Sequence, residues 1–335
     1  DTSRALRDQY GTDAAEMILF INLVAEEIEK WATVEHPDRD IKLVIFAYHK
    51  TELAPARFDQ ELNKYVPIDE SMKLRSNVAV LYAPIFANHY HGYTHSSNIN
   101  YAETMRKWSA LTDNLYLWSY GTYFPYYLVP YDNFNSLQDK YQFALENNTT
   151  YIFDQGQFNQ QIGTDWFRLK QYLLAKLQWD AYQDMNVLID NFFTHYFKDA
   201  AGSMKAYFDH YRTWYAHIAD VYNVTGYVSG TNMLNPNYWP QGVLNEWMSF
   251  IEQAYEDIAY LELQDPLLYR QLRDRITLES ISIRFLLIEF YSVFYSASDY
   301  RNMIISLKND TTRLGVVNYS EFRLLDDYFN TKLSS

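Results

Sequence analysis

The sequence has 335 residues, of which 48% are hydrophobic and only 19 are Gly or Pro, so it is globular and not disordered. No apolar run approaches the roughly 18 residues that a membrane span needs, and the absence of cysteine excludes disulfides and thiolate chemistry. The 28 basic and 42 acidic residues give a net charge of −14, which argues against binding to the phosphate backbone of nucleic acids.

Alternating helices and strands are predicted for the first half of the chain. Apolar residues at helical spacing predict a first helix, and a β-branched run ending at Tyr48 predicts a buried strand. After a longer polar connection the alternation continues. The predicted helices are 13–31, 99–111, 137–147 and 165–177, and the predicted strands are 41–48, 77–84, 115–120 and 150–153.

This order predicts a parallel sheet, because strands that alternate with helices are joined by right-handed crossovers. Polar and aromatic residues cluster after the carboxyl end of each strand, which is the functional face of a β/α barrel. From Asp184 onward the pattern is helical only, with helices expected near 187–196, 204–219 and 246–261 and a long helix or helix pair over 267–295. We therefore expect one domain over 1–180 and an α-helical domain over 181–335.

Four short segments together resemble an uncharacterised bacterial family of glycoside-hydrolase-type TIM barrels, a domain-of-unknown-function family related in architecture to α-glucuronidases and β-N-acetylhexosaminidases. They are Phe46-Ala47-Tyr48, Trp118-Ser119-Tyr120-Gly121-Thr122, Phe153-Asp154-Gln155-Gly156 and Leu173 to Asp180. The resemblance implies a (β/α)8 barrel followed by an α-helical domain, so residues 1–180 would form the C-terminal half of the barrel, strands 5–8.

On this resemblance the chain begins in the loop after the fourth strand, and it is a fragment, a cleaved chain or one piece of a larger protein. Its partners would be carbohydrate and its own missing N-terminal half or a second copy. Part of the catalytic machinery would lie upstream of Asp1, so this chain alone is expected to be inactive. Secreted, periplasmic and cell-surface locations in a bacterium all stay open.

Two carboxylates near strand ends are the candidate catalytic residues, Glu52 after the first strand and Asp154 after the fourth. Glycoside hydrolysis usually needs two carboxylates that flank the scissile bond. The alternatives are a solvated or helix-capping charge for Glu52 and a turn-stabilising role for Asp154. The family often shows an acid at the position of Ser119, so that charge is missing here.

Aromatic and amide side chains at the strand ends are the candidate substrate-binding residues. Aromatic rings stack on sugar rings while their polar tips bind sugar oxygens, and amides can read sugar hydroxyls. Trp118 and Tyr82 could instead fill the barrel interior. The candidates are Trp118, Tyr120, Tyr123, Tyr48, Tyr82, Gln155 and Gln157.

Histidines gather in the loops after the first two strands, as His49, His89, His91 and His95. Their spacing matches no closed zinc motif, so we expect no metal and no cofactor, and favour hydrogen bonding to substrate by His49 and His91. His91 is preferred because the resembled family tends to carry a histidine in this loop.

Three functions therefore stay open for the chain. It could be a glycoside hydrolase, a sugar-binding module that lost its acids, or a structural fragment whose unpaired strand edges force pairing with another chain.

Overall fold

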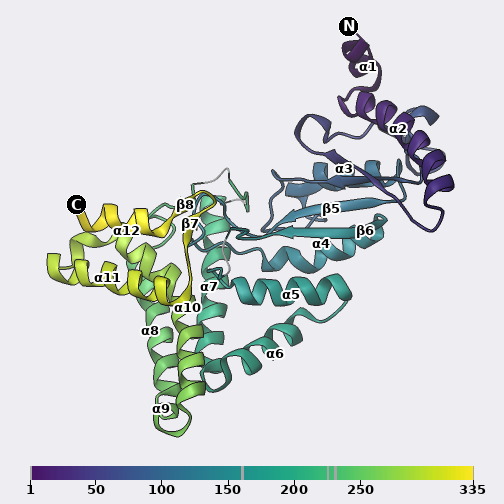
Figure 1. Ribbon diagram of the computed structural model, residues 1–335. Coiled ribbons are helices and arrows are strands. Elements are labelled where there is room, and N and C mark those ends of the chain that lie inside the picture. Colours follow the sequence, from purple (N-terminus) through teal and green to yellow (C-terminus); the bar gives the residue numbers. More distant parts are fainter. Residues whose placement is uncertain (1, 160–161, 225, 230–231, 335) are drawn as a thin grey trace. The chain divides into compact units, whose positions relative to one another are not determined.

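A computed structural model describes residues 2–159, 162–224, 226–229 and 232–334 (Figure 1). The chain divides into two compact units. The first comprises residues 1–120 and 135–155, and the second comprises 121–134 and 156–335. The first unit thus ends before the boundary expected at 180, and the segment 121–134 leaves it between two of its strands.

The first unit is built on a four-stranded parallel sheet, as predicted from the alternating pattern. Its strands are β1 (Leu43–Ala47), β4 (Val78–Tyr82), β5 (Leu115–Tyr120) and β6 (Thr149–Gln155), and they are neighbours in that order. Because the strands are parallel, their carboxyl ends meet at one edge of the sheet. The described strands form an open sheet in which β1 and β6 are the edges.

Helices of the first unit pack on alternate residues of these strands. The helices are α1 (Thr2–Tyr10), α2 (Ala14–Glu35), α3 (Ile99–Ser109) and α4 (Phe134–Glu146). Ile18 of α2, Trp108 of α3 and Phe143 of α4 join Val80 and Leu117 of the sheet in one buried cluster. This burial explains why the strands form. Side chains alternate between the two faces of a strand, so every second residue packs against the helices.

The residues between them point to the other face of the sheet, which is largely open among the described residues. Val44 and Phe46 are 47% and 46% exposed, and Tyr151 and Phe153 are 53% and 38% exposed. The rings of Phe46 and Trp118 are 5.9 Å apart, and those of Trp118 and Phe153 are 4.7 Å apart, so they form an aromatic row. We call the set Val44, Phe46, Tyr116, Trp118, Tyr151 and Phe153 the aromatic sheet face.

The polar connection between β1 and β4 contains a β-hairpin, which the sequence pattern did not reveal. It consists of β2 (Ala56–Asp59) and β3 (Lys64–Pro67), which pair antiparallel. Three 3-10 turns complete the unit, η1 (His49–Thr51), η2 (Glu70–Met72) and η3 (Ser96–Asn98).

The second unit is almost entirely helical, as expected for the C-terminal part. Its helices are α5 (Phe167–Trp179), α6 (Met185–Phe197), α7 (Ala201–Tyr222), α8 (Gln241–Ile258), α9 (Leu261–Gln264), α10 (Pro266–Phe290), α11 (Ala297–Leu314) and α12 (Leu325–Ser334), with the 3-10 turns η4 (Lys198–Ala200) and η5 (Ser292–Phe294) and the short strands β7 (Asn318–Ser320) and β8 (Arg323–Leu324). The segment 267–295 contains one long helix, α10, followed by η5. Helix α5 belongs to this unit, and the two residues that precede it, Asp165 and Trp166, are bonded to residues of α7 and α10.

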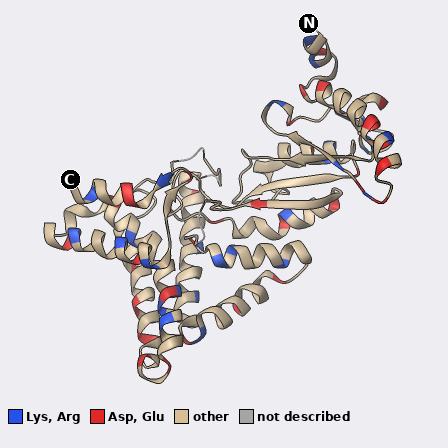
Figure 2. Ribbon diagram, in the orientation of Figure 1, with Lys and Arg blue, Asp and Glu red and all other residues tan. Residues whose placement is uncertain are grey.

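Charged residues are unevenly distributed over the first unit (Figure 2). They crowd on α2, whereas the four parallel strands contain a single charged residue, Asp154. None of the described helices is both long and apolar enough to cross a membrane.

Candidate functional site

The carboxyl edge of the parallel sheet carries the candidate site, beginning with the turn after β1. Trp108 of α3 donates its indole N–H to the backbone oxygen of Glu52 at 2.7 Å, and Thr12 donates its hydroxyl to the backbone oxygen of Leu53 at 2.6 Å. Thr51 donates to the backbone oxygen of Phe46 at 2.8 Å. These bonds fix the backbone of Glu52 at the end of the strand.

The Glu52 side chain, in contrast, is not held by the protein. Its carboxylate accepts no hydrogen bond from any described residue, although it is about half buried. Burial raises the pKa of Glu52, and no described Lys or Arg opposes this shift. An unpaired carboxyl group with a raised pKa is the usual state of a general acid.

Asn98 holds the loop that follows β4. Its side-chain oxygen accepts from the backbone N–H of Asn88 at 2.8 Å, and its amide donates to the backbone oxygens of Asn88, His91 and Gly92 at 2.9–3.0 Å. The side chain is buried, and its amide nitrogen and oxygen both bond to this loop. Residues 88–92 are therefore cross-linked into a rigid turn.

The same loop is tied to α4 by a close approach at Gly92. A Cβ atom at this position would lie 2.1 Å from Oδ1 of Asp139, so only glycine fits without movement. The Asp139 carboxylate accepts from the hydroxyl and the backbone N–H of Thr94. The loop between β4 and α3 is thus anchored on the helix that precedes β6.

This anchoring places His89 inside the unit, where its ring meets Tyr120. His89 is 7% exposed, and the two ring centroids are 5.6 Å apart at 63°. Burial, helped by the positive charge of Lys140, lowers the pKa of His89 to about 3. The imidazole is therefore neutral, and its Nε2 atom has no hydrogen-bond partner among the described residues.

Asp154 lies on the helix side of the sheet, with both carboxylate oxygens engaged. Oδ1 accepts from Nζ of Lys140 at 2.6 Å, and Oδ2 accepts from the hydroxyl of Tyr141 at 2.5 Å. Nζ of Lys140 also donates to Oγ of Ser119 at 2.9 Å, and Ser119 is the cross-strand neighbour of Asp154. Asp154 is thus the counter-ion of a buried lysine, and Ser119 completes the ammonium's coordination.

Both predicted carboxylates act electrostatically on one hydroxyl, that of Tyr93. Burial, and then the charge of Asp154, raise the pKa of Tyr93. Tyr120, Asp139 and Glu52 act on the pKa of Tyr93 in the same direction.

The remaining predicted residues of the first unit differ in exposure and contacts. Trp118 is half exposed and donates its indole N–H to the side-chain oxygen of Gln155 at 3.0 Å. Tyr48 is half buried and influences the pKa of Tyr120. Tyr82 is fully buried on the helix side and donates to the backbone oxygen of Tyr101 at 3.2 Å.

The other histidines lie nearer the surface. His49 is exposed and packs on Tyr48 and Phe86, with ring centroids 4.0 and 5.4 Å apart. The ring of His91 stacks on that of His95 at 3.7 Å, and His95 bonds Ser97 at 2.9 Å. The described residues contain no group of three or more His, Asp or Glu placed to hold a metal ion.

Two predicted residues belong to the second unit, where they have packing roles. Tyr123 is buried, and its hydroxyl accepts from the backbone N–H of Met233 at 3.3 Å. Gln157 is buried and donates to the backbone oxygens of Tyr127 and Thr164, while its oxygen accepts from the Thr164 N–H.

The sequence did not single out His89, Tyr93, Lys140 or Tyr141. His89 stood in a loop with two other histidines, and only its burial in the structure shows that its ring is the one that turns inward. Lys140 and Tyr141 lay within a predicted amphipathic helix, where such residues usually face solvent. One signal was present: a lone Asp in an apolar strand requires a buried partner.

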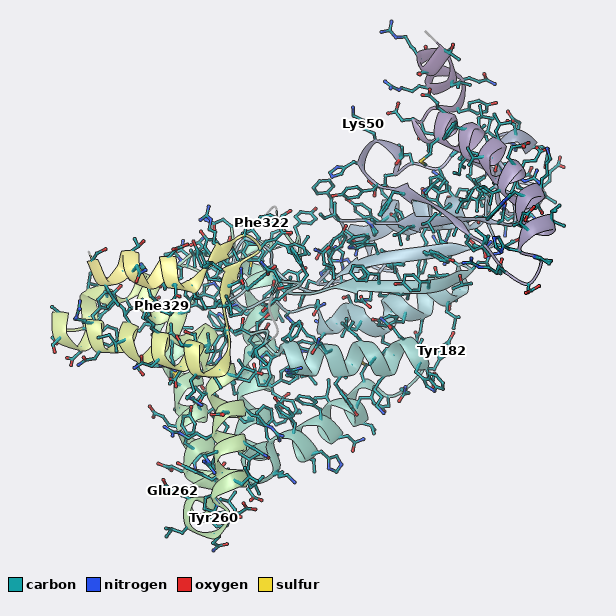
Figure 3. The ribbon with its side chains drawn as sticks, in the orientation of Figure 1. Lys50, Tyr182, Tyr260, Glu262, Phe322 and Phe329 are labelled. Carbon is teal, nitrogen blue, oxygen red and sulfur yellow. The ribbon has the colours of Figure 1, made fainter. Side chains whose placement is uncertain are left out.

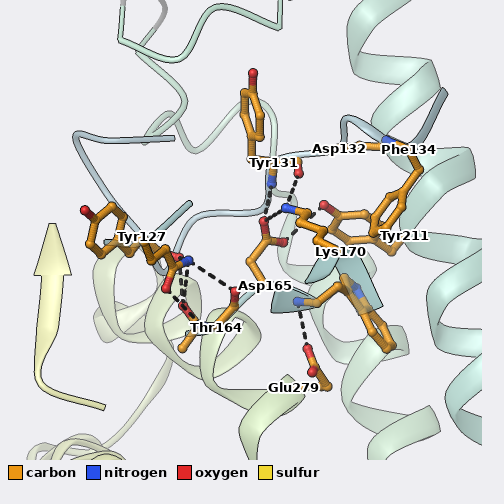
Figure 4. Close-up of polar contacts among 11 residues, drawn as sticks. Tyr127, Tyr131, Asp132, Phe134, Thr164, Asp165, Lys170, Tyr211 and Glu279 are labelled. Atoms are coloured by element: carbon orange, nitrogen blue, oxygen red, sulfur yellow. Dashed lines mark hydrogen bonds and ion pairs between the residues drawn. The ribbon is translucent and has the colours of Figure 1, made fainter. Parts of the chain in front are cut away.

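The second unit contains its own buried polar group, at the start of α5 (Figure 4). Asp165 accepts from Nζ of Lys170 at 2.7 Å and from the hydroxyl of Tyr211 at 3.1 Å, and the backbone N–H of Trp166 donates to Glu279 at 2.9 Å. Asp165 and Trp166 both have left-handed backbones, with φ of 59° and 57°. These bonds hold a conformation that non-glycine residues rarely adopt.

A family model for a domain of unknown function, DUF4838, matches residues 1–209, more than half of the chain. The chain belongs to the DUF4838 family. The DUF4838 match covers the whole first unit and the second unit as far as the first half of α7. This confirms the expectation of an uncharacterised domain family, while the expected relationship to glycoside hydrolases stays a prediction. No curated protein and no solved structure matches the chain.

Proposed function

We propose that this DUF4838 protein is a carbohydrate-active protein of the glycoside-hydrolase type, with Glu52 as its proton-transferring residue. The observation that carries the proposal is the Glu52 carboxyl group, which follows β1, is partly buried, accepts no hydrogen bond from any described residue and has its pKa raised by burial. In a protonated state it can give a proton to a glycosidic oxygen. Tyr48, Tyr120 and Trp118 supply aromatic rings for the sugar.

Asp154 is poorly suited to be the second carboxylate of such a reaction. Both of its oxygens already accept from Lys140 and Tyr141, and losing these bonds inside the protein would be costly. We therefore assign Asp154 a positioning role, and the full reaction needs a carboxylate from outside the described residues.

We also infer that the sheet is one half of a (β/α)8 barrel. Parallel sheets are normally covered on both faces, yet the aromatic sheet face is open and both β1 and β6 are edges. Four further strands would cover this face and pair both edges. This proposal accounts for large apolar residues at positions that would otherwise be polar.

The second candidate function is a sugar-binding module without catalysis. It is favoured by the engagement of Asp154 and by Ser119, which bonds a lysine where the resembled family often has an acid. In this case the aromatic rings bind sugar, and Glu52 accepts hydrogen bonds from its hydroxyls.

Hydrolysis of a panel of aryl glycosides by the intact protein, which includes the proposed N-terminal half of the barrel, separates these functions. We expect Glu52→Gln to abolish turnover and retain saccharide binding, while Glu61→Gln, the loss of an exposed acid in the β2–β3 turn, changes neither. Binding without turnover in the unmodified protein, weakened by Trp118→Ala, would establish the module. Equal turnover by the protein and its Glu52→Gln variant would refute the assignment of Glu52.

A further inference from the structure

The outward side of α2 carries an apolar stripe that the fold of the first unit does not use. Its members are the large side chains of Phe20 (66% exposed), Leu23 (68%), Trp31 (48%) and Val34 (75%). They follow one another at spacings of three, eight and three residues, so they share one side of the helix. A helix on a protein surface normally carries polar residues there, and an exposed apolar patch usually marks an interaction surface.

The opposite side of α2 is held on the first unit. Ile18 and Ala25 are buried in its core, and the side chain of Asn22 donates to the backbone oxygen of Lys73 at 2.9 Å and accepts from the Arg75 N–H at 3.1 Å. Side chains of α2 thus extend both toward the sheet and away from it (Figure 3). The helix cannot turn to bury the stripe without losing its core contacts.

The proposed barrel would not cover this stripe either. Four further strands would pair with β1 and β6 and cover the aromatic sheet face, whereas α2 packs on the other face of the sheet. The stripe points away from the sheet altogether. Its occupant is therefore a different molecule from the one that would complete the sheet.

The spacing of the stripe is symmetric about Glu27. Leu23 and Trp31 each lie four residues from Glu27, and Phe20 and Val34 each lie seven residues from it. Two α2 helices packed antiparallel about a two-fold axis at Glu27 would place Leu23 opposite Trp31 and Phe20 opposite Val34, each pair twice. Such a self-complementary stripe fits a second copy of the chain, because an unrelated helix would not require this symmetry.

Charge in the middle of the stripe fits the same arrangement. Nζ of Lys30 lies 2.8 Å from Oε1 of Glu27, one helical turn away. In the antiparallel pair the two Glu27 side chains meet at the axis, and Lys30 of each copy lies one turn from both. Two lysines thus balance the two acids. Glu16 and Glu35, exposed toward the ends of α2, disfavour an anionic membrane surface as the occupant.

We propose that the outward side of α2 binds a second copy of this chain, through an antiparallel two-fold pairing of the two α2 helices centred on Glu27. Part of this surface is ordered before association, because the ring of Trp31 packs edge-on against His36 with centroids 4.9 Å apart. The pairing is independent of the proposed carbohydrate function.

Analytical ultracentrifugation of the 335-residue chain tests the association. We expect a monomer–dimer equilibrium that Leu23→Asn weakens at least roughly tenfold, because each dimer loses the leucine contact twice. Thr33→Asn, at an exposed residue of α2 that lies off the stripe, should leave the equilibrium unchanged. Circular dichroism checks that both variants are folded. A chain that stays monomeric up to roughly 0.1 mM, or one that Leu23→Asn does not affect, would overturn the proposal.

Single cysteines test the register of the pairing, since the chain has no cysteine of its own. Under mild oxidation Glu27→Cys should link to itself, because residues that face each other at a two-fold axis come within disulfide distance. Phe20→Cys should link to Val34→Cys when the two variants are mixed, and neither should link to itself. Thr33→Cys is the matched control and should stay unlinked.

Other modes of association give different patterns. Association through the aromatic sheet face would be lost in the double variant Phe46→Thr with Phe153→Thr, whereas the pairing of α2 and its cross-links should persist. Self-linkage of Phe20→Cys as efficient as that of Glu27→Cys would indicate parallel helices and overturn the proposed pairing. Linkage of Glu27→Cys no greater than that of Thr33→Cys would overturn it as well, and would leave the stripe to a different protein.

Discussion

The Lys140–Asp154 pair shows how a single charged residue in an apolar strand is stabilised. Both side chains are almost fully buried, and their attraction must offset the loss of hydration of both charges. The contacts of Lys140 with Ser119 and of Asp154 with Tyr141 satisfy the remaining polar atoms. Removing one partner would leave the other charge buried and uncompensated.

We expect Lys140→Met to destabilise the first unit by about 3–5 kcal/mol, as measured by urea denaturation. The double variant Lys140→Met with Asp154→Leu should recover much of this loss, because no buried charge remains. Lys30→Met, at an exposed lysine paired with Glu26 and Glu27, should cost far less, because exposed ion pairs contribute little to stability. A loss as small for Lys140→Met as for Lys30→Met would contradict the structural role of the pair.

Glu279 makes the stability of the second unit depend on pH. Burial raises the pKa of Glu279 from 4.5 to about 8, and the Trp166 N–H opposes this only in part. Between these values the folded chain keeps a proton that the unfolded chain has released. Its contribution to stability is therefore fully present below pH 4.5 and is lost as the pH rises through about 8.

Melting temperatures recorded from pH 5 to pH 9 test this dependence, with the window set by the two pKa values. We expect stability to fall by up to about 1.4 kcal/mol per pH unit within that window, and Glu279→Gln to flatten the profile. An identical slope in the variant would show that Glu279 is ionised in the folded protein.

At the scale of elements, the loop between β4 and α3 depends on Gly92 and Asn98. We expect Gly92→Ala to destabilise the first unit by about 1–3 kcal/mol, because the added Cβ would displace Asp139 from Thr94. Gly202→Ala in α7 meets no atom within 4 Å and should stabilise its helix by about 0.5–1 kcal/mol. Thermal denaturation of both variants measures the difference, and a neutral Gly92→Ala would mean that the loop is not fixed against α4.

The sequence predicted the elements that carry a clear apolar period and missed those that do not. All four parallel strands were predicted because Val, Ile, Leu and aromatic residues fill them. Helix α11 was missed although Ser296 caps its start and Gly315 ends it in a left-handed conformation, because its apolar residues are few. The hairpin β2–β3 was missed because charged residues interrupt its strands.

Prediction of the site was limited by a different cause. Residues at the strand ends, such as Glu52 and Tyr120, could be found because the parallel alternation places those ends together. Which side of the sheet a residue faces depends on register, and a shift of one residue reverses it. The helix-side position of Asp154, and the inward turn of His89, therefore required the structure.

At the scale of the whole molecule, the aromatic sheet face is an apolar surface whose exposure to water is unfavourable. Contiguous apolar patches of this kind usually mark interaction sites. We expect the isolated chain to self-associate or to bind a hydrophobic dye, and the double variant Phe46→Thr with Phe153→Thr to reduce both. Phe322→Thr, at an 83% exposed ring beside β8, is the control. Sedimentation that is monomeric and unaltered by the double variant would contradict the half-barrel proposal.

The left-handed pair Asp165–Trp166 has a consequence for the order in which the chain becomes native. The Asp165 side chain accepts from Tyr211 and the Trp166 N–H donates to Glu279, two residues that follow 46 and 113 positions later. During synthesis from the N-terminus, the first turn of α5 must wait until both have left the ribosome. A shortened chain that stops at residue 209, where the family match ends, would keep Phe193 and Tyr207 against the Trp166 ring but would lack both anchors. The stretch of sequence that the family model matches thus omits two residues that hold the start of α5.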